Sequence, residues 1–248
     1  MRDFIQRTNE VSFQIEANHK KKWGLLGSIG IHKLYALIFT KKFQSFHFAN
    51  IVFSMKIARV LLIDNHDSFT WNLASLLDST GLCDLVVKQN QEINLKYVSD
   101  FDRIVISPGP GLPSERPILS EIVKEYCSSK PILGVCLGLQ VIVETFGGRL
   151  INMSTVAHGQ QQLIKVCEAA DYMFRGLAPE FKAGLYHSWA ADPSVFPDEL
   201  EITAINSEKV VMGVRHRQFE TRGIQFHPES YMTIDGRKMM MNWLKGPS

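Results

Sequence analysis

From residue 56 onward, short apolar runs that suit buried strands alternate with segments that have helical periodicity. The first run, residues 56–64, ends in the carboxylate of Asp64. A helix is predicted over residues 69–79, where leucines recur at helical spacing and Gly81 follows as a stop. Because alternating strands and helices require right-handed crossovers, we predict a three-layer α/β/α fold with a mostly parallel central sheet and a few antiparallel strands.

The remaining elements follow the same reasoning. Strands are predicted at 85–87, 103–107 and 132–135, with a helix at 118–126 and a closing helix at 235–244. The later runs at 163–166, 201–205, 210–214 and 223–226 also read as strands, and the middle ones are expected to be antiparallel.

Residues 1–55 differ in character from the rest. They hold eight Lys and Arg residues and three acidic residues, and their apolar residues show no sustained helical or strand periodicity. Three interpretations stay open: an organelle-targeting peptide, a translated upstream region with Met55 as the working start, or a small ordered appendage. The position of Met55 directly before the first strand favours the second. We therefore predict an extension over residues 1–55, disordered or loosely held, and one domain over residues 56–248.

Composition narrows the class of protein. The chain has 45% hydrophobic and 21% charged residues, which is ordinary for a globular protein. Residues 56–248 hold 19 basic and 22 acidic side chains, so no nucleic-acid partner is expected. No apolar stretch reaches the roughly 20 residues that cross a membrane. We expect a cytoplasmic protein, or one of a plastid or other organelle if the extension is a targeting peptide.

The cysteines point to chemistry rather than to disulfides or metal. Cys83, Cys127, Cys136 and Cys167 show neither close pairing nor metal-ligand spacing. Cys136 stands in Gly134-Val-Cys-Leu-Gly-Leu-Gln140, directly after a predicted strand and before a helix-forming run. A sharp strand-to-helix turn exposes a nucleophile above the sheet, and backbone N–H groups of the following helix favour a thiolate there. The spacing therefore favours a reactive cysteine over a buried structural thiol.

Two further motifs suit the same site. In Gly223-Ile-Gln-Phe-His-Pro-Glu-Ser230 a strand ends, and His227 and Glu229 follow two residues apart. A histidine at a strand end can reach a cysteine on a neighbouring strand, while the carboxylate orients its ring. The loop Ser107-Pro-Gly-Pro-Gly-Leu-Pro113 is stiff and lets its backbone approach a ligand closely. Alone, these two motifs would read as a surface turn and a tight turn.

In this order, Pro-Gly-Pro-Gly, Cys-x-Gly-x-Gln and His-Pro-Glu resemble the class I, or triad, glutamine amidotransferases over roughly residues 56–244. The segments Asp64-Asn-His-Asp-Ser-Phe-Thr-Trp-Asn72 and Tyr186-His-Ser-Trp189 are similar to the small subunit of anthranilate synthase and aminodeoxychorismate synthase. The resemblance implies hydrolysis of L-glutamine and delivery of ammonia to a large chorismate-binding subunit, without metal or cofactor. The product, the stoichiometry and the coupling to the partner stay open.

The resemblance also implies roles for single residues. Cys136 would be the nucleophile, His227 the acid and base, and Glu229 the group that orients His227. The N–H groups of Gly109 and Leu137 would form an oxyanion hole. The glutamine substrate would be held by Gly109, Pro110, Gly111, Gln140, Ser188 and Trp189. Many relatives have His where this chain has Leu139, and activity is expected to survive that difference.

Two alternatives remain beside this interpretation. Other triad amidotransferases share the three catalytic residues but are usually fused to a synthetase, for which this chain is expected to be too short. A non-catalytic regulatory protein of the same fold would need none of Cys136, His227 and Glu229. Labelling by a glutamine-mimicking alkylator distinguishes an enzyme from such a binding protein.

Overall fold

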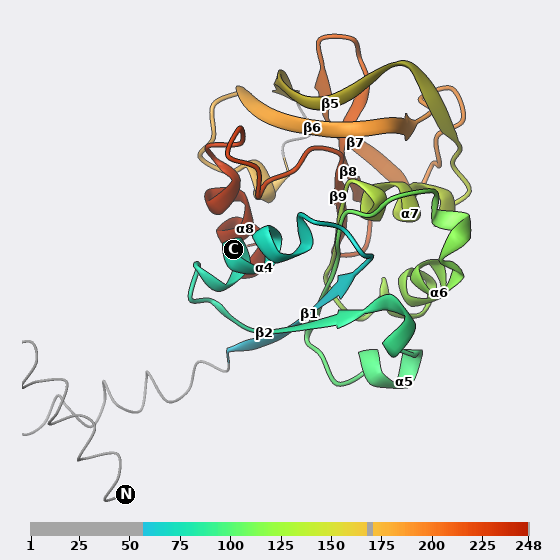
Figure 1. The fold of residues 1–248 in the computed structure, drawn as a ribbon, viewed down its shortest axis with the longest axis vertical. Coiled ribbons are helices and arrows are strands. Elements are labelled where there is room, and N and C mark those ends of the chain that lie inside the picture. The colour runs from blue at the N-terminus through green and yellow to red at the C-terminus, as the bar shows by residue number, and fades with distance from the viewer. Residues whose placement is uncertain (1–56, 168–170, 248) are drawn as a thin grey trace, which may run out of the picture. The chain divides into compact units, whose positions relative to one another are not determined.

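The computed structural model describes residues 57–167 and 171–247, and one sheet runs through this part of the chain (Figure 1). The expectations for residues 1–55 lie outside the described residues. The sheet has nine strands in the order β2-β1-β3-β4-β9-β8-β7-β5-β6. Within the described ranges, no helix has the length and apolar character to cross a bilayer.

One half of the sheet is parallel. It consists of β2 (Cys83–Gln89), β1 (Ala58–Asp64), β3 (Arg103–Ile106), β4 (Ile132–Val135) and β9 (Thr221–Ile224). Every neighbouring pair in this half is parallel. The carboxyl ends of these strands therefore meet along one edge, where open α/β sheets bind their ligands.

The other half is antiparallel. It continues from β9 through β8 (Val211–His216) and β7 (Leu200–Asn206) to the long strands β5 (Leu150–Val166) and β6 (Glu180–Ala191). Each neighbouring pair from β9 to β6 is antiparallel. The strands β5 and β6 lie across the top of the view in Figure 1.

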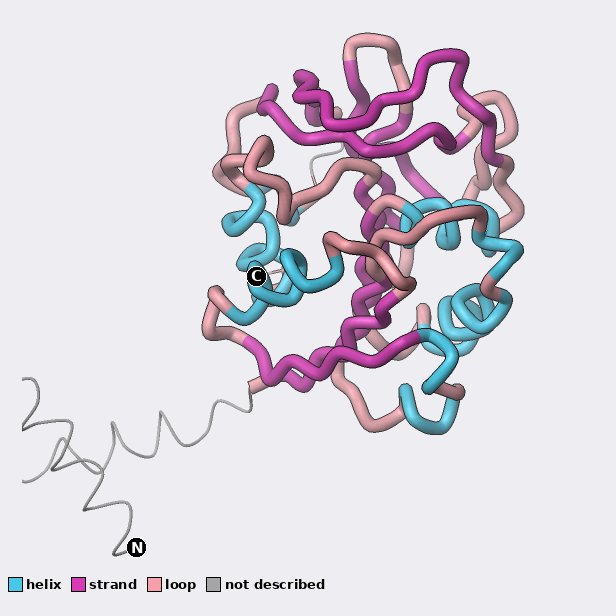
Figure 2. The backbone as a smooth tube through the Cα atoms, viewed as in Figure 1, coloured by secondary structure: helices cyan, strands magenta, loops and turns pink. Residues whose placement is uncertain are grey.

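Helices cover both faces of the parallel half, as the tube in Figure 2 shows. On one face lie α4 (Thr70–Asp78) and α8 (Gly236–Lys245). The other face carries α6 (Pro117–Tyr126) and α7 (Leu137–Thr145), with the short α5 (Leu95–Val98) beside α6. In the described part of the chain, 3-10 turns at Asn90–Glu92, Pro113–Glu115 and Tyr172–Phe174 complete the helical elements.

The alternation of side chains along a strand divides the core in two. Val60 and Leu62 of β1 pack into the cluster that includes α4 and α8. Leu61 and Ile63 pack into the cluster that includes α6 and α7. All four side chains are fully buried. Strands buried on both faces read as continuous apolar runs, and this is why the sequence reveals β1, β3 and β4 so directly.

The three-layer prediction is confirmed, and every predicted strand and helix has a counterpart in the structure. Two features were missed. The sequence predicted only residues 163–166 of β5, and it did not predict β6 at all. Much of β5 is exposed and polar on both faces. In β6, Gly184 and Ser188 interrupt the apolar pattern by which a strand is predicted. His216 is buried and stacks on Phe219 at 4.4 Å between ring centroids.

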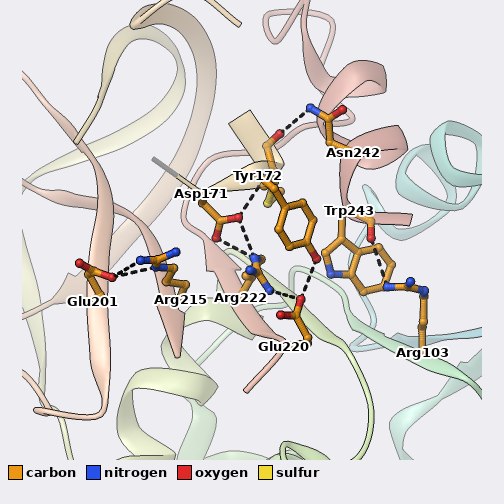
Figure 3. Close-up of polar contacts among 10 residues, drawn as sticks. Arg103, Asp171, Tyr172, Glu201, Arg215, Glu220, Arg222, Asn242 and Trp243 are labelled. Carbon is orange, nitrogen blue, oxygen red and sulfur yellow. Dashed lines mark hydrogen bonds and ion pairs between the residues drawn. The ribbon is translucent and has the colours of Figure 1, made fainter. Parts of the chain in front are cut away.

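A buried charge network holds the start of β9 (Figure 3). Arg222 is paired with Asp171 at 2.6 Å and with Glu220 at 2.7 Å. The Arg222 guanidinium also lies 4.0 Å from the centre of the Tyr172 ring. From α8, the Asn242 side chain donates to the carbonyl oxygen of Met173 at 3.0 Å. The network therefore ties β9, which leads to the candidate site, to the 3-10 turn before β6.

Candidate functional site

Cys136 sits at the tightest point of the backbone between β4 and α7. Its φ of 53° and ψ of −101° lie outside the usual regions for an L residue. Such a conformation persists only where the surrounding structure enforces it, and it is common at functional sites. The side chain is 6% exposed, at the N-terminus of α7 and at the carboxyl edge of the sheet. The predicted strand-to-helix turn is thus present.

Two glycines make this turn sterically feasible. A Cβ added at Gly138 would lie 2.6 Å from the backbone oxygen of Ile106 on the adjacent strand. A Cβ added at Gly134 would collide with the backbone of Gly138. Helix α7 therefore approaches the sheet at a distance that excludes side chains at both positions. This close approach fixes where the Cys136 sulfur is held.

The segment after β9 holds Cys136 through both its backbone and its sulfur. The Cys136 N–H donates to the carbonyl oxygen of Ile224 at 2.8 Å. The side-chain Nε2 of Gln225 lies 3.5 Å from the Cys136 Sγ and donates to it. Gln225 is fully buried. The nucleophile candidate is therefore anchored by the same stretch of chain that carries His227.

His227 and Glu229 form a buried pair next to this cysteine. The His227 Nδ1 lies 2.7 Å from Glu229 Oε1, and their side chains are 2% and 0% exposed. The His227 Nε2 is buried and makes no hydrogen bond to the described residues. One ring nitrogen is thus oriented by a carboxylate, while the other is left for a reacting group. Hydrogen bonds between a catalytic base and its nucleophile are often long without substrate and shorten when substrate binds.

Aromatic rings and backbone contacts fix the plane of the His227 ring. The ring centroids of Phe69 and Tyr186 lie 5.0 Å and 4.9 Å from that of His227. The His227 N–H donates to the carbonyl oxygen of Gly184 at 3.0 Å, and the Thr233 hydroxyl donates to the His227 carbonyl oxygen at 2.7 Å. The imidazole is therefore held on several sides by the start of α4, by β6 and by its own turn.

Two buried histidines in this region have pKa values that are shifted in opposite directions. Burial lowers the pKa of His227, but its interactions with Cys136 and Glu229 outweigh that effect and raise the pKa to about 10. Burial lowers the pKa of His187 to about 4, although a hydrogen bond with the Trp189 carbonyl oxygen acts in the other direction. His227 is therefore held in its protonated form to higher pH than an ordinary histidine, while the neutral form of His187 is favoured.

The Pro-Gly loop packs against the cysteine turn. A Cβ added at Gly109 would lie 2.6 Å from the Leu137 side chain and 2.7 Å from that of Asn65. The Asn65 amide donates to the Ser107 carbonyl oxygen at 3.0 Å, and the Asn90 amide donates to Asn65 Oδ1 at 2.9 Å. The ends of β1, β2 and β3 therefore hold the loop beside the Leu137 side chain.

The residues predicted to hold the substrate are only partly brought together. The Gln140 Nε2 donates to the Trp189 carbonyl oxygen at 2.9 Å, which joins α7 to β6 next to Ser188. Pro110 and Gly111 are exposed on the Pro-Gly loop. Beyond Gly111, the N–H of Leu112 donates to the Glu115 carboxylate at 2.8 Å, and this contact shapes the end of the loop.

Sequence reasoning missed three residues of this site. Gln225 contacts the sulfur, and Phe69 and Tyr186 flank the histidine. Gln225 could have been noticed in the sequence, because it is a polar residue inside the apolar run 223–226. Leu139 is fully buried and packs in the core. It therefore contributes packing rather than a polar group.

The chemistry of the arrangement is that of acyl transfer. A cysteine on a strained turn, a histidine with one free nitrogen and an orienting carboxylate are the parts that cleave an amide or ester through a thioester. Among residues 57–167 and 171–247, no group of three or more His, Cys, Asp and Glu side chains is arranged to hold a metal ion.

Comparisons with known proteins identify a family for the chain. Residues 61–246 match the family model "Glutamine amidotransferase class-I". A Haemophilus influenzae protein assigned as anthranilate synthase component II is 42% identical over 189 residues, which cover 76% of this chain and 97% of that protein. Aminodeoxychorismate synthase component 2 of Escherichia coli is 38% identical over 187 residues, covering 75% and 98%.

A solved structure shows the same fold. A Thermoplasma acidophilum protein, described as part of a GMP synthase, superposes with a TM-score of 0.69, covering 76% of this chain and 93% of that one. The sequence identity is 23%, so this likeness concerns the fold alone.

Proposed function

The chain belongs to the class-I glutamine amidotransferase family, and on that basis we propose that it hydrolyses glutamine at Cys136 and supplies the ammonia to a synthase partner. One observation carries the proposal. The sulfur of Cys136 stands on a strained turn beside a histidine whose Nδ1 is bound 2.7 Å from the Glu229 carboxylate. A protein that only binds a partner has no need of this arrangement.

The first half of the reaction forms a thioester. The Cys136 thiolate attacks the side-chain carbonyl carbon of glutamine, and the negative charge moves to the carbonyl oxygen. The N–H groups of Gly109 and Leu137 receive that oxyanion, a contribution of a few kcal/mol per donor. The C–N bond then breaks as His227 gives its proton to the amide nitrogen, and ammonia leaves. Glu229 stabilises the imidazolium and fixes its orientation.

The second half restores the enzyme. His227, now neutral, takes a proton from water, and the hydroxide attacks the γ-glutamyl thioester carbon. The C–S bond breaks, glutamate is released and the thiolate reforms beside the imidazolium. The two side chains thus return to the charged pair that the raised pKa of His227 favours. The net reaction converts glutamine and water to glutamate and ammonia.

Substrate binding is assigned to the loop and strand around the sulfur. Pro110 and Gly111 extend the loop that begins at Gly109, and Gln140 and Trp189 are already joined by a hydrogen bond at 2.9 Å. Ser188 lies between His187 and Trp189 on β6. We assign these residues to the main-chain and side-chain amide groups of glutamine.

The partner is a large chorismate-binding subunit, and the product is anthranilate or aminodeoxychorismate depending on which partner binds. The two relatives described above are named as second components of such synthases. Exposed apolar side chains beside the triad support a docking surface: Tyr231 and Ile234 are 85% and 86% exposed, and Trp71, two residues after Phe69, is 66% exposed.

The test is the Cys136→Ala variant, prepared together with whichever large subunit co-purifies. Glutamine-dependent formation of the aromatic amine from chorismate should be lost, while formation with added ammonia should persist. Cys127→Ala is the matched control, because Cys127 is also a buried free thiol but lies at the end of α6. Loss of both activities in Cys136→Ala, with the control intact, would contradict the proposed role.

A further inference from the structure

We propose that Gln225 is a positioning residue that orients the Cys136 sulfur and favours its thiolate form. The inference rests on the proposed function of Cys136. It concerns a residue that lies two positions before His227, outside the triad, the oxyanion groups and the residues assigned to glutamine.

The contacts of Gln225 form a chain from β6 to the sulfur. The Gln140 Nε2 donates to the Trp189 carbonyl oxygen at 2.9 Å and to the Gln225 Oε1 at 3.3 Å. The Gln225 Nε2 in turn donates to the Cys136 Sγ at 3.5 Å. The Gln225 N–H is bound to the Met212 carbonyl oxygen at 3.0 Å, so its backbone is fixed as well.

The chain of contacts determines which end of the Gln225 amide faces the sulfur. A backbone carbonyl oxygen only accepts hydrogen bonds, so Gln140 must turn its NH2 group toward Trp189. That same NH2 group faces Gln225, which must therefore present its oxygen to Gln140. The Gln225 NH2 group is consequently the one directed at Cys136. The orientation follows from the partners themselves.

A donor in this position changes the chemistry of the sulfur. A hydrogen bond to a charged acceptor is about twice as strong as one to a neutral acceptor, so the contact favours thiolate over thiol. Among the described residues, His227 is a titratable group that interacts with Cys136, and Glu229 is bound to the other side of its ring. Gln225 approaches from the segment between Ile224 and His227 and adds a neutral donor to that pair.

Burial argues against a purely space-filling role. Gln225 is fully buried and Gln140 is 4% exposed. A buried amide costs free energy unless it is hydrogen-bonded, and an apolar side chain would fill the same space without that cost. The partners that Gln225 uses are the reactive sulfur and a residue assigned to the substrate. The hydrogen bonds of its amide therefore serve the site.

The experiment measures how fast iodoacetamide alkylates Cys136 as a function of pH, on the full chain. Iodoacetamide is small and neutral, so its rate reports the thiolate rather than glutamine binding. The variants are Gln225→Met, which removes the donor, and Gln225→Glu, which places a negative charge beside the sulfur. Thr221→Val is the control, because Thr221 is a buried polar residue at the far end of β9.

In Gln225→Met, we expect the alkylation profile to shift to higher pH, so that the rate on its rising limb falls about tenfold, with a larger shift in Gln225→Glu. Glutaminase kcat should fall more than KM rises. Thr221→Val should match the wild type. A wild-type pH profile in folded Gln225→Met would overturn the inference.

If Gln225→Met does not fold, Gln225→Asn decides by the same criterion, since it keeps the amide but ends one methylene short of the sulfur. Failure of the inference can be told from failure of the proposed function. If a glutamine-mimicking alkylator does not label Cys136 in the wild type, the proposed function fails. If it does, and the Gln225 variants keep the wild-type profile, only the positioning role fails.

Discussion

The His227 Nδ1 and Glu229 Oε1 atoms are 2.7 Å apart, and Pro228 is the one residue between them in the chain. Because the two residues are so close in sequence, the local turn alone is enough to bring the carboxylate to the imidazole ring. The cysteine comes from a different strand, 91 positions earlier by residue number. The fold therefore has to place only one sulfur against a histidine that is already oriented.

Replacing Glu229 by Gln should lower glutaminase kcat by about a hundredfold or more. The amide keeps the shape of the side chain but cannot stabilise the imidazolium, so the effect should appear in kcat rather than KM. Steady-state kinetics measure it. Glu208→Gln, in an exposed turn, is the control and should behave as the wild type. Equal activity of the two variants would remove Glu229 from the mechanism.

Nuclear magnetic resonance should separate the two buried histidines by pH. His227, with its pKa raised to about 10, should remain protonated at pH 8, while His187, with its pKa lowered to about 4, should be neutral throughout the neutral range. Alkylating Cys136 removes the thiolate, so the His227 transition should then move to lower pH. A His227 transition near 6.5, unchanged by alkylation, would be inconsistent with a cysteine–histidine ion pair.

The same shifts predict how stability depends on pH. The raised pKa of His227 contributes stability that is fully present below about 6.5 and is lost as the pH rises to about 10. The lowered pKa of His187 acts in the opposite sense, since its contribution is present above about 6.5 and is lost as the pH falls toward 4. Urea unfolding across this pH range should show that the free energy of unfolding declines both above and below about pH 6.5.

Asp171→Asn should destabilise the domain by about 3 kcal/mol, because among the described residues it leaves the buried Arg222 guanidinium with only the half-exposed Glu220 as an ionic partner. Glu92→Gln breaks an exposed pair with Lys88 and should cost less than about 0.5 kcal/mol. Urea midpoints compare the two variants. Equal, small losses would mean that the network in Figure 3 does not hold the start of β9.

Much of this arrangement could be predicted from the sequence, because its signals are local. The run 132–135 predicted β4 to the residue, and this placed Cys136 at the turn. Strands buried on both faces leave such apolar runs. The run 223–226 placed β9 within two residues and left His227 just beyond it.

The rest depends on contacts between distant segments. β6 forms because it pairs with β5 along its length, from Glu180 to Ala191, and its own sequence has no clear alternation of apolar and polar residues. The roles of Phe69 and Tyr186 beside His227 likewise arise only when the start of α4 and β6 meet at the end of β9. Gln225 was visible as a polar residue in an apolar run, but its partner lies 89 positions away.

The central claim is that Cys136 is a glutamine-directed nucleophile, and covalent labelling tests it most directly. The full chain is treated with a glutamine-mimicking alkylator, with and without excess glutamine, and the modified residues are identified by mass spectrometry. We predict modification at Cys136, suppressed by glutamine, with Cys83, Cys127 and Cys167 untouched. No label at Cys136, or equal labelling of the other three thiols that glutamine does not suppress, would contradict it.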